Sequence, residues 1–166
     1  MPLIRNASLL DSEEIANISV AAYKEYAKIL SVNNWQKIKQ NLSNVEQTAL
    51  VANFIVAEVE NKIVGAVAYY SPGKSNPKFF NSDCASLRLL AVDPQHRGKG
   101  IGRKLTIEGI NRAKHNRAAA VGLYTSEAMT TAQKLYGSLG FNRVKELPSM
   151  LGLRYWLYIL TLNSQT

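Results

Sequence analysis

The amino-acid sequence predicts an α/β (α+β) protein in which a mixed β-sheet carries helices on its faces. Two observations indicate this class. Segments rich in β-branched and aromatic residues alternate with segments whose apolar residues recur at helical spacing, in the order β α α β β β α β α β β. Hydrophobic residues make up 46% of the 166 residues and charged residues 19%, as in an ordinary globular protein. We therefore expect a single domain spanning residues 1–166.

The first half of the chain is expected to contain a strand, two helices and a β-hairpin. Residues 3–7 form a short β-rich run, and the helix that follows carries acidic residues in its first turn, which favour a helix start. A second and more polar helix is predicted over residues 35–48. The hairpin is indicated by two β-rich runs around a turn-like sequence, at residues 54–59 and 63–70.

The second half alternates strands and helices after a loop rich in Pro, Gly and Asn at residues 71–83. A strand over residues 85–92 stops at Asp93-Pro94. Helical spacing begins at Gly100, and Gly140 is expected to cap a later helix at its C-terminus. The remaining elements are strands at 121–125, 141–146 and 155–162 and a helix at 128–139.

Charge and cysteine usage restrict the function classes. Lys and Arg number 20 against 12 Asp and Glu, and the net charge of +8 favours polyanionic partners such as nucleotides. The single cysteine, Cys84, excludes an internal disulfide framework, and with two isolated histidines it does not assemble a zinc site, so no metal is expected. No apolar run approaches the roughly 20 residues of a membrane helix, and no signal peptide is recognisable. We expect a cytoplasmic protein without a membrane partner.

A glycine-rich basic segment lies between the predicted strand and the helix that begins near Gly100. Glycines allow backbone N–H groups to approach a ligand, and the start of a helix offers unpaired donors and a partial positive charge. The spacing fits neither a P-loop nor a dinucleotide fingerprint. A diphosphate is the predicted occupant, and a plain connecting turn is the alternative. The segment is Arg97-Gly98-Lys99-Gly100-Ile101-Gly102.

Two segments carry a family resemblance. The run from Val92 to Gly102 resembles the acetyl-CoA signature of the GNAT (GCN5-related N-acetyltransferase) superfamily, and the run from Ala132 to Phe141 resembles its second signature. The resemblance implies a mixed, mostly antiparallel central sheet of about six to seven strands with helices on both faces. It also implies acetyl-CoA as co-substrate, with its pyrophosphate held by the backbone of residues 97–102. The pantetheine and acetyl group would then follow the backbone of Leu90, Ala91 and Val92, on a strand that carries a bulge and splays from its neighbour.

In the second signature, the resemblance makes Tyr136 the catalytic residue that hydrogen-bonds the coenzyme sulfur and protonates the leaving thiolate. The alternative for Tyr136 is packing on the apolar stripe of its helix. The sequence departs from the family at Met129, where many relatives have an Asn that bonds the pantetheine arm. Thr125, Ser126 and Thr130 are the nearby polar residues available to replace that contact.

The acceptor is expected to be a primary amine of a small molecule or of a peptide or protein, attacked directly in a ternary complex. Relatives often place a Glu on the strand before the pyrophosphate loop, but residues 85–89 contain no carboxylate. Asp83, Glu127 and Glu58 are the candidates for a general base, with a water chain as the alternative. Acceptor specificity is expected from residues 26–45, 71–83 and 146–155. Aromatic candidates for a pocket wall are Trp35, Phe79, Phe80, Tyr155 and Trp156.

Two further functions remain as alternatives. The same fold serves as a non-catalytic acyl-CoA sensor if the missing strand carboxylate and Met129 mark a lost activity. A nucleic-acid-binding domain fits the net charge, but Lys and Arg are scattered and no reading helix or aromatic RNA motif is present, so no nucleic acid is expected. The sequence leaves the oligomeric state open and names a homodimer as a candidate.

Overall fold

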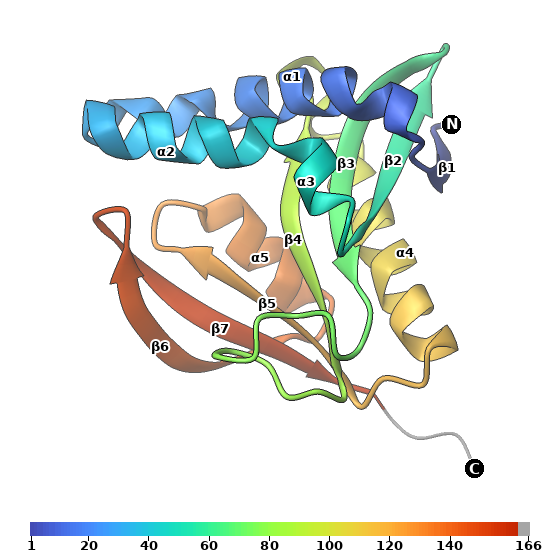
Figure 1. The fold of residues 1–166 in the computed structure, drawn as a ribbon, viewed down its shortest axis with the longest axis vertical. Coiled ribbons are helices and arrows are strands. Elements are labelled where there is room, and N and C mark those ends of the chain that lie inside the picture. Colours follow the sequence, from blue (N-terminus) through green and yellow to red (C-terminus); the bar gives the residue numbers. More distant parts are fainter. Residues whose placement is uncertain (163–166) are drawn as a thin grey trace. The chain divides into compact units, whose positions relative to one another are not determined.

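A computed structural model describes residues 1–162, and they divide into two compact units. The first unit contains Met1–Tyr69 and Leu89–Gly109, and the second contains Tyr70–Arg88 and the chain from Ile110 onward. The strands form one seven-stranded sheet in the order β1-β2-β3-β4-β5-β7-β6. Strand β4 (Cys84–Val92) and helix α4 (Ile101–His115) each contribute residues to both units. The mixed sheet with helices that the sequence predicts is confirmed (Figure 1).

The strands β1, β2 and β3 of the first unit pair antiparallel, with β2 between β1 and β3. The predicted hairpin between β2 and β3 is confirmed. Its turn residues Glu60 and Asn61 both have positive φ, 50° and 64°, and this left-handed pair matches the twist of a two-residue hairpin. The strand bounds are β1 (Leu3–Asn6), β2 (Asn53–Val59) and β3 (Lys62–Tyr70).

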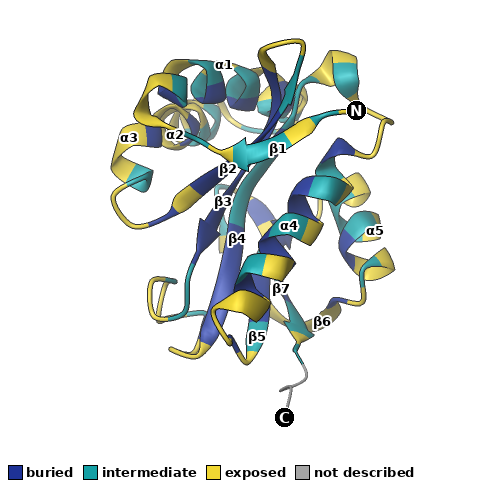
Figure 2. Cartoon of the chain, turned by 90° about the vertical axis from the view of Figure 1, so that its right-hand side faces the viewer, coloured by how far each residue is buried: buried dark blue, intermediate teal, exposed yellow. Residues whose placement is uncertain are grey.

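Helices cover the strands of the first unit. Helix α4 lies in front of these strands in Figure 2, and α1 and α2 lie behind them. The predicted second helix is present but divided, because the chain leaves the helical region at Asn44, where ψ is 46°. It also begins earlier than predicted, since the Ser31 hydroxyl accepts the N–H of Asn34 and caps it. The helices are α1 (Ser12–Tyr23), α2 (Val32–Ser43) and α3 (Val45–Thr48), with a 3₁₀ turn over Lys24–Lys28.

A glycine on β3 sets the distance between α4 and the sheet. A Cβ atom at Gly65 would lie 2.9 Å from side-chain atoms of both Ile101 and Leu105, and 3.3 Å from the carbonyl oxygen of Ala91. Ile101, Leu105 and Ala91 are buried. Gly65 therefore lets the first turns of α4 pack closely beside the end of β4.

Gly65→Ala is expected to lower the free energy of unfolding by about 1–3 kcal/mol, because the added methyl group overpacks this contact. Gly137→Ala is the matched control, since a Cβ there meets no atom within 4 Å and alanine is the better helix former. Urea unfolding of both variants measures the difference. Equal stability of the two alanine variants would show that α4 does not depend on this close approach.

The second unit combines parallel and antiparallel pairing. Strand β4 pairs with β5 in parallel at Cys84, Ala85 and Ser86, and β7 pairs antiparallel with both β5 and β6. Strand β6 runs four residues further than predicted and includes Pro148. A proline is tolerated there because β6 is an edge strand, whose outward N–H needs no partner strand. The elements are β5 (Ala120–Ser126), α5 (Thr130–Ser138), β6 (Asn142–Met150) and β7 (Leu153–Thr161).

The strands of the second unit present two different faces. On one face, the α5 side chain of Tyr136 lies next to Tyr158 of β7, with ring centroids 6.4 Å apart. On the other face, the loop between β3 and β4 covers β5, and a Cβ at Gly122 would collide with the ring of Phe80. We call these the helix face and the loop face. Within residues 1–162, no helix is long and apolar enough to cross a membrane.

Candidate functional site

The candidate site begins where β4 ends and the chain turns toward α4. The backbone N–H of Asp93 donates to the carbonyl of Val64 on β3, at 2.8 Å, which fixes the end of the strand. The Asp93 carboxylate accepts the N–H of Gln95 at 3.0 Å and starts a 3₁₀ turn over Pro94–His96. The Asp-Pro pair thereby sets the direction in which the glycine segment leaves the sheet.

The glycine segment presents open backbone at the start of α4. Gly98 and Gly100 have φ values of 78° and 77°, in the left-handed region that favours glycine, and a Cβ at either position would meet no atom within 4 Å. Helix α4 begins at Ile101, and its first regular hydrogen bond runs from Lys104 N–H to the Gly100 carbonyl at 3.0 Å. By geometry, the N–H groups of a first helical turn have no acceptor within the helix. The arrangement fits an anion such as a diphosphate.

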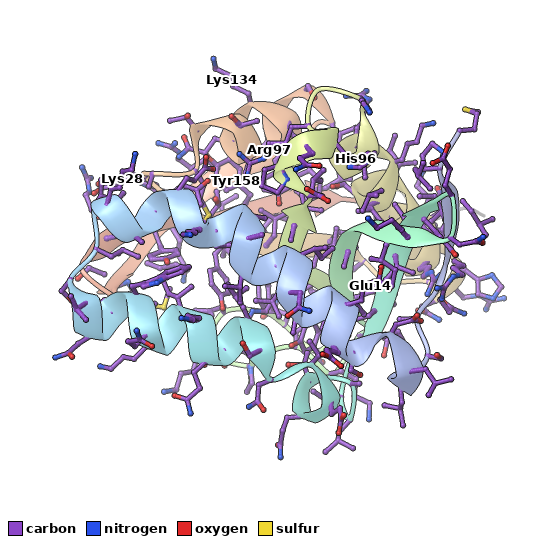
Figure 3. The ribbon with its side chains drawn as sticks, turned by 90° about the horizontal axis from the view of Figure 1, so that it is seen from above. Glu14, Lys28, His96, Arg97, Lys134 and Tyr158 are labelled. Atoms are coloured by element: carbon purple, nitrogen blue, oxygen red, sulfur yellow. The ribbon has the colours of Figure 1, made fainter. Side chains whose placement is uncertain are left out.

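The side chain of Arg97 is turned toward α1 (Figure 3). Its guanidinium donates to the backbone carbonyl of Ala22 at 2.8 Å and to the carboxylate of Glu25 at 3.1 Å. The ion pair between Arg97 and Glu25 is half-exposed, with side-chain exposures of 42% and 51%. A pair this exposed contributes little to the stability of the fold, and its main effect is to hold the Arg97 side chain in place. Arg97 thus ties the glycine segment to the end of α1, a role that the sequence did not predict.

Strand β4 is irregular just before the residues predicted to follow the pantetheine. Leu89 has a φ of 63°, in the left-handed region that residues with a Cβ rarely adopt, so the extended backbone of β4 is interrupted at this position. The Tyr23 hydroxyl donates to the carbonyl oxygen of Leu90 at 3.0 Å. Ala91 is buried, while Leu90 and Val92 are half-buried. Tyr23 was missed by sequence reasoning, because nothing in its spacing distinguishes it from a packing residue of the helix.

The predicted coenzyme-binding residues all lie in the first unit, whereas Tyr136 lies in the second. Tyr136 is buried, and its ring centroid is 5.7 Å from that of Phe141. Two of the three residues predicted to replace the missing Asn contact have hydrogen-bond partners within the second unit. The Thr125 hydroxyl donates to the Met129 sulfur at 3.2 Å, and the Ser126 hydroxyl accepts the N–H of Ala128 at 3.3 Å.

The candidate general bases have different surroundings. Glu58 accepts a hydrogen bond from Arg5 Nε at 2.7 Å, which makes it part of a structural ion pair in the first unit and a weak base candidate. Asp83 and Glu127 are both exposed and both belong to the second unit.

The thiol of Cys84 is buried at the start of β4 and donates to the Ala85 carbonyl at 3.2 Å. Burial, with a smaller contribution from the charge of Asp83, raises its pKa to about 11. At neutral pH the group is a thiol, and the thiolate is the nucleophilic form. A covalent acetyl-enzyme on Cys84 is therefore disfavoured.

The aromatic residues considered for an acceptor pocket divide into separate groups. Phe79, Phe80 and Tyr155 come together on the loop face around Tyr124, which sequence reasoning missed. Trp156 lies elsewhere in the unit, where Arg143 and Arg154 stack on its ring at 4.3 and 5.0 Å from the centroid. Trp35 is on α2 in the first unit.

Comparison with known proteins connects this geometry to one family. Residues 13–141 match the profile of the Acetyltransferase (GNAT) family. That segment covers more than half of the chain and includes both the glycine segment and α5.

The chain also matches individual proteins, each over part of its length. The chain is 34% identical to the mycothiol acetyltransferase of Thermobispora bispora over 92 residues, which are 55% of this chain and 30% of that protein. It is 31% identical to the N-acetylaspartate synthetase of Xenopus tropicalis over 123 residues, which are 72% of this chain and 43% of that protein. The chain thus spans less than half the length of these relatives.

A solved structure shares the fold. The PaiA N-acetyltransferase of Thermoplasma acidophilum, crystallised with coenzyme A, superposes with a TM-score of 0.78 at 19% identity, covering 98% of this chain and 99% of that one.

Proposed function

The chain belongs to the Acetyltransferase (GNAT) family, and from this premise we propose that it is an N-acetyltransferase, transferring the acetyl group of acetyl-CoA to a primary amine. The observation that carries the proposal is the open backbone of Gly98 and Gly100 directly before α4. A diphosphate at this point gains hydrogen bonds from the first-turn N–H groups and the favourable end of the helix dipole. Lys99 and Lys104 add positive charge to the same segment.

In the proposed reaction, the amine nitrogen attacks the thioester carbonyl carbon, the carbon–sulfur bond breaks, and the amine loses a proton as the thiolate gains one. The acetyl group is proposed to follow the backbone of Leu90 to Val92, where the Tyr23 hydroxyl holds the Leu90 carbonyl in place. Tyr136 is proposed to act at the sulfur. No covalent intermediate is needed, because direct attack by the amine is sufficient.

The demand for a base depends on the acceptor. An α-amino group with a pKa near 7.7–8.0 supplies the neutral amine far more readily than a lysine amine with a pKa near 10.4. Because Glu58 is held by Arg5, we propose that a water molecule or exposed Asp83 or Glu127 receives the proton. The cytoplasmic location, the single domain and the homodimer stay predictions.

A second candidate function is a non-catalytic acyl-CoA sensor. It is favoured by one observation: Met129 occupies the position of the family's pantetheine-binding Asn, and its sulfur accepts the Thr125 hydroxyl. A sensor binds acetyl-CoA without consuming it when amines are present.

The proposal is tested by incubating the purified protein with acetyl-CoA and a panel of amines while free thiol is measured. The panel comprises amino acids, polyamines, aminoglycosides and peptides with free N-termini. Thiol release that requires one class of amine supports the transferase. Coenzyme A binding without thiol release for any amine supports the sensor.

Glu25→Gln is expected to weaken coenzyme A binding about 2- to 5-fold, because it removes the ion pair that positions Arg97. Arg97→Met removes the bond to Ala22 as well and is expected to weaken binding further. Titration calorimetry measures both affinities. Tighter binding by Glu25→Gln would contradict this view, because it would show that Glu25 competes with the coenzyme for the Arg97 charge.

Cys84→Ala is expected to keep most of the acetyl-transfer activity, because the buried thiol is not ionised at neutral pH. Mass spectrometry of peptides after incubation with acetyl-CoA alone provides a direct check. An acetylated Cys84 peptide would establish a covalent intermediate and overturn the ternary-complex mechanism.

A further inference from the structure

A groove opens in the first unit beside the first turns of α1. Its walls come from the start of α1, the last residue of α2 and the helix α3, and its volume is about 630 Å³. Cavities of about 300–1,000 Å³ are typical of sites for small molecules. The residues that line it lie between Ser12 and Leu50, so the groove belongs entirely to one compact unit.

The side chains of the groove carry negative charge. Two of them are carboxylates, Glu13 of α1 and Glu46 of α3, and none of the described residues that line it is Lys or Arg. Within residues 1–162, neither carboxylate takes part in a hydrogen bond or an ion pair. The neighbouring acids are already used, because Asp11 accepts from Arg5 and Glu14 accepts a backbone N–H of β3. In a chain with a net charge of +8, such an acidic groove is suited to a cation.

A buried hydroxyl group opens into the same groove. Ser12 is only 9% exposed, yet its hydroxyl has no hydrogen-bond partner in the part of the chain that the structure describes. The hydroxyl is not sealed off, because Nδ1 of His96 is the only fully enclosed side-chain nitrogen or oxygen without a partner in that part. Since Ser12 lines the groove, its hydroxyl faces the space that a ligand would occupy. A buried polar group of this kind gains free energy when a ligand supplies the missing hydrogen bond.

The groove suits an organic cation better than a metal ion. No group of three or more His, Cys, Asp or Glu side chains in residues 1–162 could hold a metal, and hard cations take six or more oxygen ligands. Ala16, Val45 and Leu50 add apolar surface to the lining. The helix dipoles oppose each other here, because α1 begins and α2 ends at the groove, so the two full carboxylate charges decide the sign.

We propose that this groove binds a linear diamine, a flexible alkyl chain with an ammonium group at each end. Each ammonium group pairs with one of the two carboxylates, the Ser12 hydroxyl oxygen accepts a hydrogen bond from one of them, and the alkyl chain packs on the apolar lining. The inference does not depend on the proposed transferase function, because it concerns binding alone.

The groove is separate from the segment proposed to hold the coenzyme. Arg97 of that segment contacts the last turn of α1 at Ala22, whereas the groove lies at the first turn, at Ser12. Ten residues of helix span about 15 Å. A diamine in the groove is therefore a second ligand of the protein and not the acceptor of the acetyl group.

The test is a calorimetric titration of 1,4-diaminobutane into the protein without acetyl-CoA, so that no acetyl transfer takes place. Butylamine, which carries one ammonium group on the same alkyl chain, is expected to bind at least about 10-fold more weakly. Glu13→Gln and Glu46→Gln are each expected to weaken diamine binding about 3- to 10-fold, because each removes one charged partner of an ammonium group. Ser12→Ala is expected to weaken it about 2- to 5-fold, because it removes a neutral acceptor.

Glu60→Gln is the matched control, because it removes one carboxylate of the same unit at the turn between β2 and β3, outside the groove. It is expected to leave the diamine affinity unchanged. Absence of diamine binding to the wild-type protein, or equal affinity in the wild type and both groove variants, would overturn the inference. A loss in Glu60→Gln as large as in Glu13→Gln would also overturn it, because the attraction would then come from the overall charge and not from the groove.

A second measurement, with acetyl-CoA present, tests whether the groove is separate from acetyl transfer. Thiol release with an acceptor other than a diamine is expected to have the same kcat/KM in the wild type, Glu13→Gln and Glu46→Gln. If the diamine is acetylated and both variants lower its kcat/KM by the factor by which they weaken binding, the groove is the acceptor site and the inference is wrong. If no amine releases thiol, the proposed transferase function fails, and the titration without acetyl-CoA still decides whether the groove binds a diamine.

Discussion

Gly100→Glu is expected to weaken acetyl-CoA binding by at least about 100-fold while the protein remains folded. The reason is local. Gly100 immediately precedes α4, and a side chain there enters open space, so nothing in the protein itself obstructs it. The glutamate carboxylate would occupy the space proposed for the diphosphate, and like charges at such a contact cost several kcal/mol.

The positive φ of Gly100 requires a control, because any residue with a Cβ is strained at 77°. Gly100→Gln has the same shape and the same backbone strain but no charge, and it is expected to bind the coenzyme more tightly than Gly100→Glu. Calorimetry gives the affinities, and circular dichroism with thermal unfolding shows that both variants fold. Wild-type affinity in folded Gly100→Glu would remove the diphosphate from this segment.

Tyr136→Phe is expected to lower kcat by about 10²–10⁴ if Tyr136 protonates the thiolate, with little change in coenzyme affinity. A free phenol with a pKa near 10 is about 1.5 units less acidic than a thiol near 8.5, so complete transfer costs roughly 2 kcal/mol. A hydrogen bond that strengthens as charge develops on sulfur avoids this cost and gives a smaller decrease. Both roles act in the transition state, so kcat at saturating substrates is the quantity to measure.

Tyr158→Phe is the matched control for Tyr136, because Tyr158 is a buried tyrosine on the helix face whose hydroxyl accepts from Arg143 at 3.1 Å. It is expected to affect stability more than kcat. If Tyr136→Phe keeps wild-type kcat, Tyr136 serves only in packing against Phe141 and Tyr158, and the proton comes from water or from the substrate.

The features that the sequence predicted well are those encoded locally. The hairpin followed from two β-rich runs around Glu60-Asn61, and the open turn before α4 followed from glycines between a strand and a helix. Each depends on residues that are neighbours in the chain. The extent of β6 was underestimated because Pro148 reads as a strand end unless the strand is known to lie at a sheet edge.

The features that the sequence did not predict depend on contacts between distant segments. Arg97 reads as a phosphate ligand by its position, yet its side chain reaches back 75 residues to Ala22. Tyr23 contacts Leu90 across 67 residues, and Arg88 meets Tyr124 only because β4 and β5 are parallel neighbours. No periodicity or motif encodes such pairings, since they arise from the way helix α1 and the strands pack together.

The central claim is that the protein moves an acetyl group from sulfur to nitrogen. Its most direct test supplies acetyl-CoA labelled with ¹³C at the acetyl carbonyl, together with free amino acids, and follows the label by NMR. We predict that the thioester signal is replaced by an amide carbonyl signal, one for each thiol released, and that the label is absent from Cys84. Label that appears only as free acetate, or that remains in the thioester with every amine supplied, would contradict the claim.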